Sequence, residues 1–375
     1  MAASKIDVVF LHCDQGMGTL VKIYDSKDRL ASLALLDLGS EAGTKKYSDK
    51  ALETVIRALN QMKSDKMTPM IDLLLVSHQD TDHWSLLPDL LARIEEQFID
   101  FGIKEIYYGG LGWKKGASEA IEEWEEAYGV PAEPFGKEQS DFSKPGKLND
   151  FTQIDDVKFH LMCVNVPISR SAGDLKRNGT SAVIAIQFAG IFVVIPGDAT
   201  ADTCGWMNTN LFAAWKKKGQ GNPVQPCRAM GAPHHGALRT IASNYVSTDK
   251  AKLEVATTFA NNVAAEHVVA SAGWYSKFKH PYKSVLLLLA VKAKDTSKHD
   301  LVWYDGTKAD WDHVKNYKRG VYTTITTLTD PPKRTGWMFT ISATGEIAFF
   351  IDWEQAEIIP PYERHDRYPA VPHNE

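Results

Sequence analysis

Residues 71–95 read IDLLLVSHQDTDHWSLLPDLLARIE, and this stretch decides the fold. It opens with an apolar run over residues 71–76, which is broken only by Asp72 and is too short for an ordinary helix. Such a run predicts a strand that is buried on both faces. Leucine and isoleucine then recur three and four residues apart over residues 86–94, which predicts one face of a helix. The stretch therefore reads as a strand, a polar loop and a helix of an α/β protein.

Four side chains that can bind a metal stand within six residues of this loop: His78, Asp80, Asp82 and His83. Alternate residues of an extended segment point the same way, so the first three project to one side and His83 turns in from the start of the helix. Two imidazoles and two carboxylates exceed the needs of one ion, and the spacing therefore indicates a pair of ions. Simple helix capping would use one carboxylate and would explain neither histidine.

The composition is that of a soluble globular protein, with 375 residues, 44% of them hydrophobic and 24% charged. The formal charge of −5 gives no overall electrostatic footprint for nucleic acid, although a local basic patch stays open. The four cysteines form no Cys-x-x-Cys pair, and we expect them to be reduced. No signal-peptide core and no membrane-length apolar run are present, so we expect a cytoplasmic protein with no membrane part.

Other segments show the periodicity of strands and helices. We expect strands at residues 6–11, 19–24, 32–37, 104–108, 157–164 and 267–272, a terminal hairpin at 337–342 and 346–352, and helices at 49–62, 118–128 and 202–218. Residues 284–291 fit either a helix or a strand. Two β-rich runs within residues 178–198 flank Ala189 and Gly190, which predicts a hairpin whose second strand ends just before Asp198.

With the loop at His78, three later motifs follow in order along the chain: Gly197-Asp198, Pro233-His234-His235-Gly236 and His280-Pro281. Together they resemble the metallo-β-lactamase fold superfamily. The closest resemblance is to the branch of the ComEC/Rec2 DNA-uptake proteins, which carries H-x-D-x-D-H where most of the superfamily carries H-x-H-x-D-H.

Residues 6–295 carry this resemblance, which also includes Asn178 and Ser181 before the hairpin and an early turn matched in part by Gln15-Gly16. Two departures stand out. Met17 and Gly18 replace the acidic residue of that turn, which puts any binding role of the turn in doubt, and Ala237 replaces the usual serine after His-His-Gly.

The resemblance implies an αββα sandwich, in which two mixed β-sheets lie face to face with helices outside. We assign residues 1–300 to a hydrolase domain in which residues 113–150 form a charged surface insertion. Residues 301–375 would form a β-rich extension that packs on the same domain and ends in a polar tail.

The resemblance also implies two divalent ions, zinc or manganese, with Asp198 as the bridging carboxylate. The expected metal ligands are His78, Asp80, Asp82, His83, Asp198 and His234. The same resemblance gives catalytic roles to Asp82, His235 and His280 and substrate contacts to Asn178 and Lys279. His235 and His280 are open to two roles, as further ligands or as donors of a proton or hydrogen bond.

The reaction expected from such a site is hydrolysis by a water molecule that the ions activate. The resemblance favours phosphodiester bonds, hence a nuclease or a cyclic-nucleotide phosphodiesterase with a nucleotide or nucleic-acid substrate. The alternatives are a lactone or ester hydrolase and a degenerate member that acts as a binding module. Six basic residues flank the motifs and form either a rim for a polyanion or ordinary solvated charges: Arg170, Lys176, Arg177, Arg239, Lys277 and Lys279.

Overall fold

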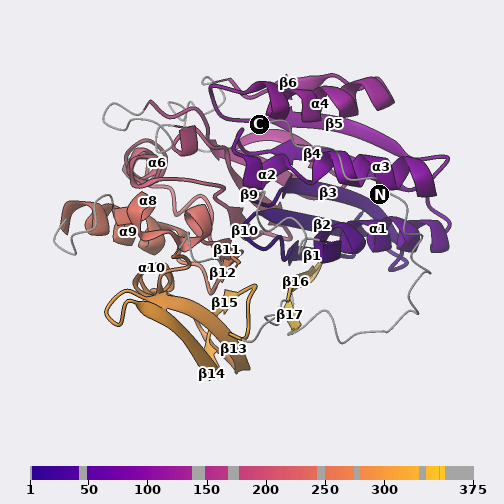
Figure 1. Cartoon of the computed structure of the whole chain (residues 1–375). Coiled ribbons are helices and arrows are strands. Elements are labelled where there is room, and N and C mark those ends of the chain that lie inside the picture. The colour runs from indigo at the N-terminus through magenta and orange to yellow at the C-terminus, as the bar shows by residue number, and fades with distance from the viewer. Residues whose placement is uncertain are drawn as a thin grey trace.

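Two large mixed β-sheets lie face to face in the computed structural model, and helices cover their outer faces (Figure 1). The structure describes residues 2–41, 49–136, 148–167, 177–242, 250–273, 279–328, 335–345 and 347–350. This arrangement is the αββα sandwich that the sequence predicts.

The first sheet has eight strands and contains the stretch that decides the fold. In spatial order it runs β17 (Ile347–Phe350), β16 (Trp337–Ser342), β1 (Lys5–Phe10), β2 (Gly18–Tyr24), β3 (Leu30–Leu38), β4 (Met70–Val76), β5 (Gly102–Tyr108) and β6 (Ala132–Pro134). The pairs from β17 to β3 are antiparallel. The pairs from β3 to β6 are parallel, so the strands β4 and β5 end at the same edge.

The second sheet has seven strands and contains the predicted hairpin. It runs β15 (Val321–Thr323), β12 (His267–Ala270), β11 (Cys227–Gly231), β10 (Ile191–Ile195), β9 (Val183–Phe188), β8 (Val157–Cys163) and β7 (Asn149–Ile154). The strands β9 and β10 pair antiparallel around Ala189 and Gly190, as predicted. From β10 to β15 the strands are parallel, so β10 and β11 also end at one edge.

The core between the sheets consists of alternate residues of strands that are buried on both faces. Leu73 and Leu75 of β4 belong to this core, together with Val193 and Ile195 of β10. The intervening Leu74, together with Ile71 and Val76, packs with the helices instead. This two-sided burial explains why β4 and β10 appear in the sequence as unbroken apolar runs rather than as alternating ones.

Helices cover both outer faces (Figure 1). Over the first sheet lie α1 (Asp49–Ser64), α3 (Leu87–Gln97) and α4 (Lys115–Tyr128), which share a core with the outward-facing side chains of β4. Over the second lie α6 (Ala201–Met207), the π-helical turn η3 (Asn208–Phe212), α7 (Ala213–Lys217), α8 (Leu238–Ala242), α9 (Lys250–Val263) and α10 (Lys283–Leu289). Residues 284–291, for which the sequence left two possibilities, are thus mainly helical.

The helix α4 buries Ala117, Ile121 and Trp124, and it connects β5 to the parallel edge strand β6. Residues 115–134 therefore belong to the layered structure, while residues 137–147 of the proposed insertion lie outside the described part. After residue 300 the chain returns to both sheets through β15 and β16. The division of the chain at residue 300 stays a prediction.

A separate two-stranded sheet of β13 (Asp295–Asp305) and β14 (Asp310–Arg319) lies beside α10 (Figure 1). All four cysteines are buried and free of disulfides, as expected. Among the described helices, none combines the length and the apolar character that crossing a bilayer requires. The proline-rich tail after residue 357 lies outside the described residues.

Candidate metal centre

Three turns that are distant in sequence converge at one edge of the sandwich. The loop after β4 carries His78 and continues into the short helix α2 (Thr81–Trp84), the end of β10 is followed by Asp198, and the end of β11 by the turn η4 (Pro233–Gly236). Asp198 is almost fully buried and lies between the histidines of the other two turns. The convergence that the order of motifs predicts is therefore present.

The two carboxylate oxygens of Asp198 face different histidines. Oδ2 lies 3.6 Å from Nε2 of His78 and 3.5 Å from Nδ1 of His234. Oδ1 lies 3.2 Å from Nε2 of His83 and 4.0 Å from Nε2 of His235. The carboxylate of Asp198 thus lies between two groups of nitrogen atoms.

Asp80 and Asp82 complete the two groups. Oδ2 of Asp80 lies 3.8 Å from Nε2 of His78, while Oδ2 of Asp82 lies 3.1 Å from Nε2 of His235. Four residues each bring one ligand atom within 4.8 Å of the others, so this set could hold a metal ion: Asp82, His83, Asp198 and His235.

Three atoms of the cluster are buried and lack a hydrogen-bond partner among the described residues: Nε2 of His78, Nε2 of His83 and Oδ1 of Asp198. Leaving a buried polar atom without a partner costs about 1–3 kcal/mol. All three face the interior of the same cluster, where a divalent cation would satisfy nitrogen lone pairs and a carboxylate oxygen together. The residues present therefore fit a metal ion.

Asp37 orients His83, and it is a functional residue that the sequence analysis missed. Nδ1 of His83 donates to Oδ2 of Asp37 at 2.9 Å, which leaves Nε2 facing Asp198 at 3.2 Å. The backbone N–H and the hydroxyl of Ser77 donate to the two oxygens of Asp37 at 2.6 and 2.8 Å. Asp37 ends a buried apolar strand, as Asp198 does, and this shared pattern was the signal available in the sequence.

His235 is held in a comparable way by the backbone. Its Nδ1 donates to the carbonyl oxygen of Ser271 at 2.7 Å, and its Nε2 faces Oδ2 of Asp82 at 3.1 Å. His234 and His235 both adopt left-handed backbone conformations, with φ of 45° and 54°. Such conformations are strained for residues other than glycine and persist where surrounding contacts enforce them. The strain is consistent with a turn that is shaped for a site.

Asn178, expected to contact substrate, lies against His234. Its amide donates to Nδ1 of His234 at 3.0 Å, and the hydroxyl of Thr240 lies 2.9 Å from the same nitrogen. Nδ1 of His234 also faces Asp198, so this histidine would bind an ion through Nδ1 only by exchanging those hydrogen bonds.

His280 is buried beside the cluster, and its ring stacks on that of His235 with a centroid separation of 5.4 Å. Lys279 is exposed, and its ammonium lies 5.5 Å from the centroid of the Tyr304 ring. The structure thus brings His280 to the cluster and places Lys279 toward the hairpin of β13 and β14.

The early turn supports the metal-binding loop. The backbone N–H of Met17 donates to the carbonyl oxygen of Asp82 at 2.9 Å. A Cβ atom at Gly16 would lie 1.9 Å from the carbonyl oxygen of Gly39, and one at Gly39 would lie 2.4 Å from the backbone of Asp82. The two glycines are needed because three backbone segments pack together beneath the cluster.

The charges of the cluster stabilise one another. Burial opposes ionisation of Asp198, but the neighbouring His234 and His83 hold its pKa well below the usual value. The pKa of His83 is raised despite burial, since Asp37 and Asp198 favour its charged form. Burial and the nearby His235 and His234 lower the pKa of His280, which keeps this ring neutral.

The remaining predicted residues lie outside the cluster or beyond the described part of the chain. Arg239 is exposed, whereas Arg170, Lys176 and Lys277 are not among the described residues. His160 is buried in β8, and its Nε2 lies 2.9 Å from Oε1 of Gln187.

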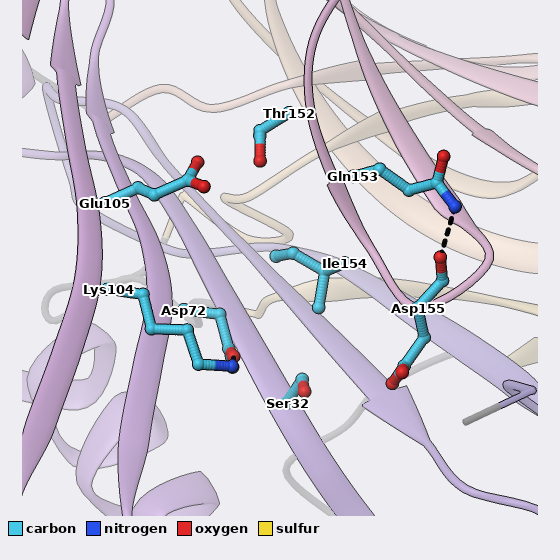
Figure 2. Close-up of a pocket in the computed structure, with 8 residues that line it drawn as sticks. All are labelled: Ser32, Asp72, Lys104, Glu105, Thr152, Gln153, Ile154 and Asp155. Atoms are coloured by element: carbon cyan, nitrogen blue, oxygen red, sulfur yellow. Dashed lines mark hydrogen bonds and ion pairs between the residues drawn. The ribbon is translucent and has the colours of Figure 1, made fainter.

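A small pocket of about 130 Å³ lies between the two sheets, away from the cluster. Figure 2 shows its lining, which includes Asp72 near the start of β4 and the paired Lys104. The metal-binding loop follows the other end of β4, so this pocket is not part of the candidate centre.

The two-sheet αββα sandwich with histidines and aspartates gathered at one edge is the arrangement that the resemblance of the sequence implies. No protein-family model matches the chain, and no curated protein matches it. Similar solved structures include the metallo-β-lactamase fold protein YhfI from Bacillus subtilis, which is 11% identical over 88% of this chain and 99% of that chain, with a TM-score of 0.42.

Two yeast structures are similar at the same level. Unliganded yeast PDE1 is 11% identical over 77% of this chain and 92% of that chain, with a TM-score of 0.38. The long form of RNase Z from yeast is 11% identical over 73% of this chain and 37% of that chain, with a TM-score of 0.40. At this level of identity and TM-score, these likenesses decide nothing about the site or the reaction.

Proposed function

We propose that the protein is a metal-dependent hydrolase with two divalent ions in the cluster around Asp198. The observation that carries the proposal is the position of Asp198, whose two oxygens face two separate groups of histidines. The three buried atoms without hydrogen-bond partners support it, because they face the same interior.

In this proposal His78, Asp80 and His234 hold the first ion, and Asp82, His83 and His235 hold the second. His235 is proposed here as a ligand, because its Nδ1 proton is already donated to the carbonyl oxygen of Ser271. Three carboxylates make the donor set hard and anionic, which suits manganese as well as zinc.

Ions bound there would supply Lewis acidity and would activate a water molecule for attack near neutral pH. The protein's own contribution is orientation. Asp37 and the carbonyl oxygen of Ser271 fix which nitrogens of His83 and His235 face inward. The neutral ring of His280, stacked beside His235, would donate a hydrogen bond to the substrate or its leaving group.

The substrate class that we favour is a phosphodiester, as in a nucleotide or a nucleic acid. The H-x-D-x-D-H motif of residues 78–83 supports this choice through its resemblance to the ComEC/Rec2 branch.

The proposal is tested by measuring metal content and hydrolysis together. Purified protein is loaded with manganese or zinc and assayed on single-stranded DNA, RNA, cyclic nucleotides and a chromogenic lactone. We expect bound metal and phosphodiester cleavage, both lost in Asp198→Asn and retained in Asp100→Asn, which makes the same change at an exposed site. Failure of the wild-type protein to bind either metal would refute the proposal, and cleavage of the lactone alone would refute the substrate class.

A further inference from the structure

Asp80 is the position at which the sequence departs from the commoner H-x-H-x-D-H motif, and it is paired with Arg177. Nε of Arg177 donates to Oδ1 of Asp80 at 3.1 Å. The other oxygen, Oδ2, lies 3.8 Å from Nε2 of His78 and so faces the cluster. The two side chains are 27% and 22% exposed, which places the pair at the mouth of the site rather than in free solvent.

A carboxylate at this position adds one negative charge to a site that already contains Asp82 and Asp198. Like charges within a partly buried cluster repel one another, and the guanidinium of Arg177 offsets one of them. The guanidinium is planar and always charged, and its donors lie in a fixed fork. It therefore supplies both a compensating charge and a direction for the carboxylate.

We propose that Arg177 positions Asp80 and balances the extra charge that this aspartate brings to the metal site. The inference rests on the proposed metal-binding function. Arg177 holds Oδ1 so that Oδ2 alone is directed at the ion, and the Arg177–Asp80 pair together takes the place of a neutral imidazole. The carboxylate of Asp80 and the guanidinium of Arg177 then act together. A substitution of either side chain changes what the other contributes to metal affinity.

A double-mutant cycle tests this unit, with the affinity for Mn²⁺ and Zn²⁺ measured by calorimetric titration as the readout. In the presence of Asp80, Arg177→Gln should weaken metal binding by roughly tenfold, as loss of a residue that orients a ligand generally does. In an Asp80→His background, the same Arg177→Gln change should instead strengthen binding, because the guanidinium then stands beside a neutral ligand and repels the dication. The reversal of sign is the expected result.

Arg93→Gln is the matched control, since Arg93 forms a comparable 2.9 Å pair with Asp49 on the surface. It should leave the metal affinity unchanged in both backgrounds. Arg177→Lys keeps the charge and loses the fork, so its affinity should lie between those of the wild type and Arg177→Gln. An affinity equal to that of the wild type would overturn the positioning role.

The metal-free protein provides a readout that does not depend on bound metal. Arg177→Gln should lower the thermal unfolding midpoint when Asp80 is present and should leave it unchanged in an Asp80→Asn background, where no charge needs balancing. Suppose that the wild type binds metal, but that Arg177→Gln has the same effect on metal affinity with Asp80 present and in the Asp80→His background. The inference about Arg177 is then wrong, while the proposed metal-binding function stands. If the wild type binds no metal, the proposed function fails with it.

Discussion

Asp37 accepts a hydrogen bond from Nδ1 of His83 at 2.9 Å, although 46 residues separate them in the sequence. This contact determines which nitrogen of His83 faces Asp198. The ends of β3 and β4 are neighbours in the first sheet, so the parallel pairing of these strands brings the carboxylate to the metal-binding loop.

Replacing Asp37 by asparagine should impair metal binding without removing any ligand. The single oxygen of asparagine is needed to accept the backbone N–H of Ser77, so its N–H₂ group faces Nδ1 of His83. That group cannot accept the Nδ1 proton, so the proton shifts to Nε2 and blocks the nitrogen that faces the site. We expect the metal affinity to fall about 10- to 100-fold. Titration with Mn²⁺ measures the effect, and Asp100→Asn serves as the control. Unchanged affinity would show that Asp37 has no orienting role.

Replacing Gly16 by alanine should destabilise the fold. The added Cβ would lie 1.9 Å from the carbonyl oxygen of Gly39, and neither backbone can move without shifting the loop of Asp82. We expect a loss of about 3 kcal/mol in the free energy of unfolding, measured by urea denaturation. Gly221→Ala is the control, because nothing lies within 4 Å of its added Cβ. Equal stability of the two variants would contradict the prediction.

His267 should make the protein less stable in mild acid. Burial lowers its pKa in the folded state from 6.5 to about 4. Between these values the unfolded chain binds a proton that the folded chain does not, so stability present above pH 6.5 is lost as the pH falls toward 4. The contribution to the slope is at most about 1.4 kcal/mol per pH unit.

The measurement is urea denaturation of metal-free wild type and His267→Gln at several pH values between 7.5 and 4.5. The other titrating groups are common to both proteins, so the difference between the two curves isolates His267. We expect the wild type to lose more stability than the variant across this range. Parallel curves would show that His267 titrates normally in the folded state.

Binding of metal should stabilise the fold, because the cluster joins turns that follow strands of both sheets. A ligand that binds only the folded state at 100 times its dissociation constant adds about 2.7 kcal/mol. We expect Mn²⁺ or Zn²⁺ to raise the unfolding midpoint of the wild type, a chelator to reverse the shift, and Asp198→Asn to abolish it. A shift that survives in Asp198→Asn would place the bound ion elsewhere.

Two of the strands that deliver the site, β4 and β10, could be predicted because each is an apolar run that ends in a polar turn, whereas β11, which precedes His234 and His235, was not predicted. The run of β4 led to residues 78–83, and the hairpin of β9 and β10 led to Asp198. These signals lie within single segments, and the order of the motifs along the chain predicted that the segments converge. The αββα fold was implied by the resemblance that these motifs carry.

Residues that act through another residue could not be predicted in the same way. Asp37 looks like any aspartate at the end of a strand, and only the pairing of β3 with β4 shows its partner. The contact between Ser271 and His235 uses a backbone carbonyl, which leaves no trace in the side-chain pattern. The spacing of apolar residues alone could not decide between a helix and a strand for residues 284–291, because a short buried helix and a buried strand have the same composition.

The strand β1 pairs with β16, so Asp7 lies opposite Thr340 although 333 residues separate them. During synthesis β1 is made well before β16, because more than 300 residues lie between the two strands. Until β16 is made, β1 presents an open edge to which other nascent chains can attach. The edge of β1 is therefore protected only once a strand from a much later part of the chain has paired with it.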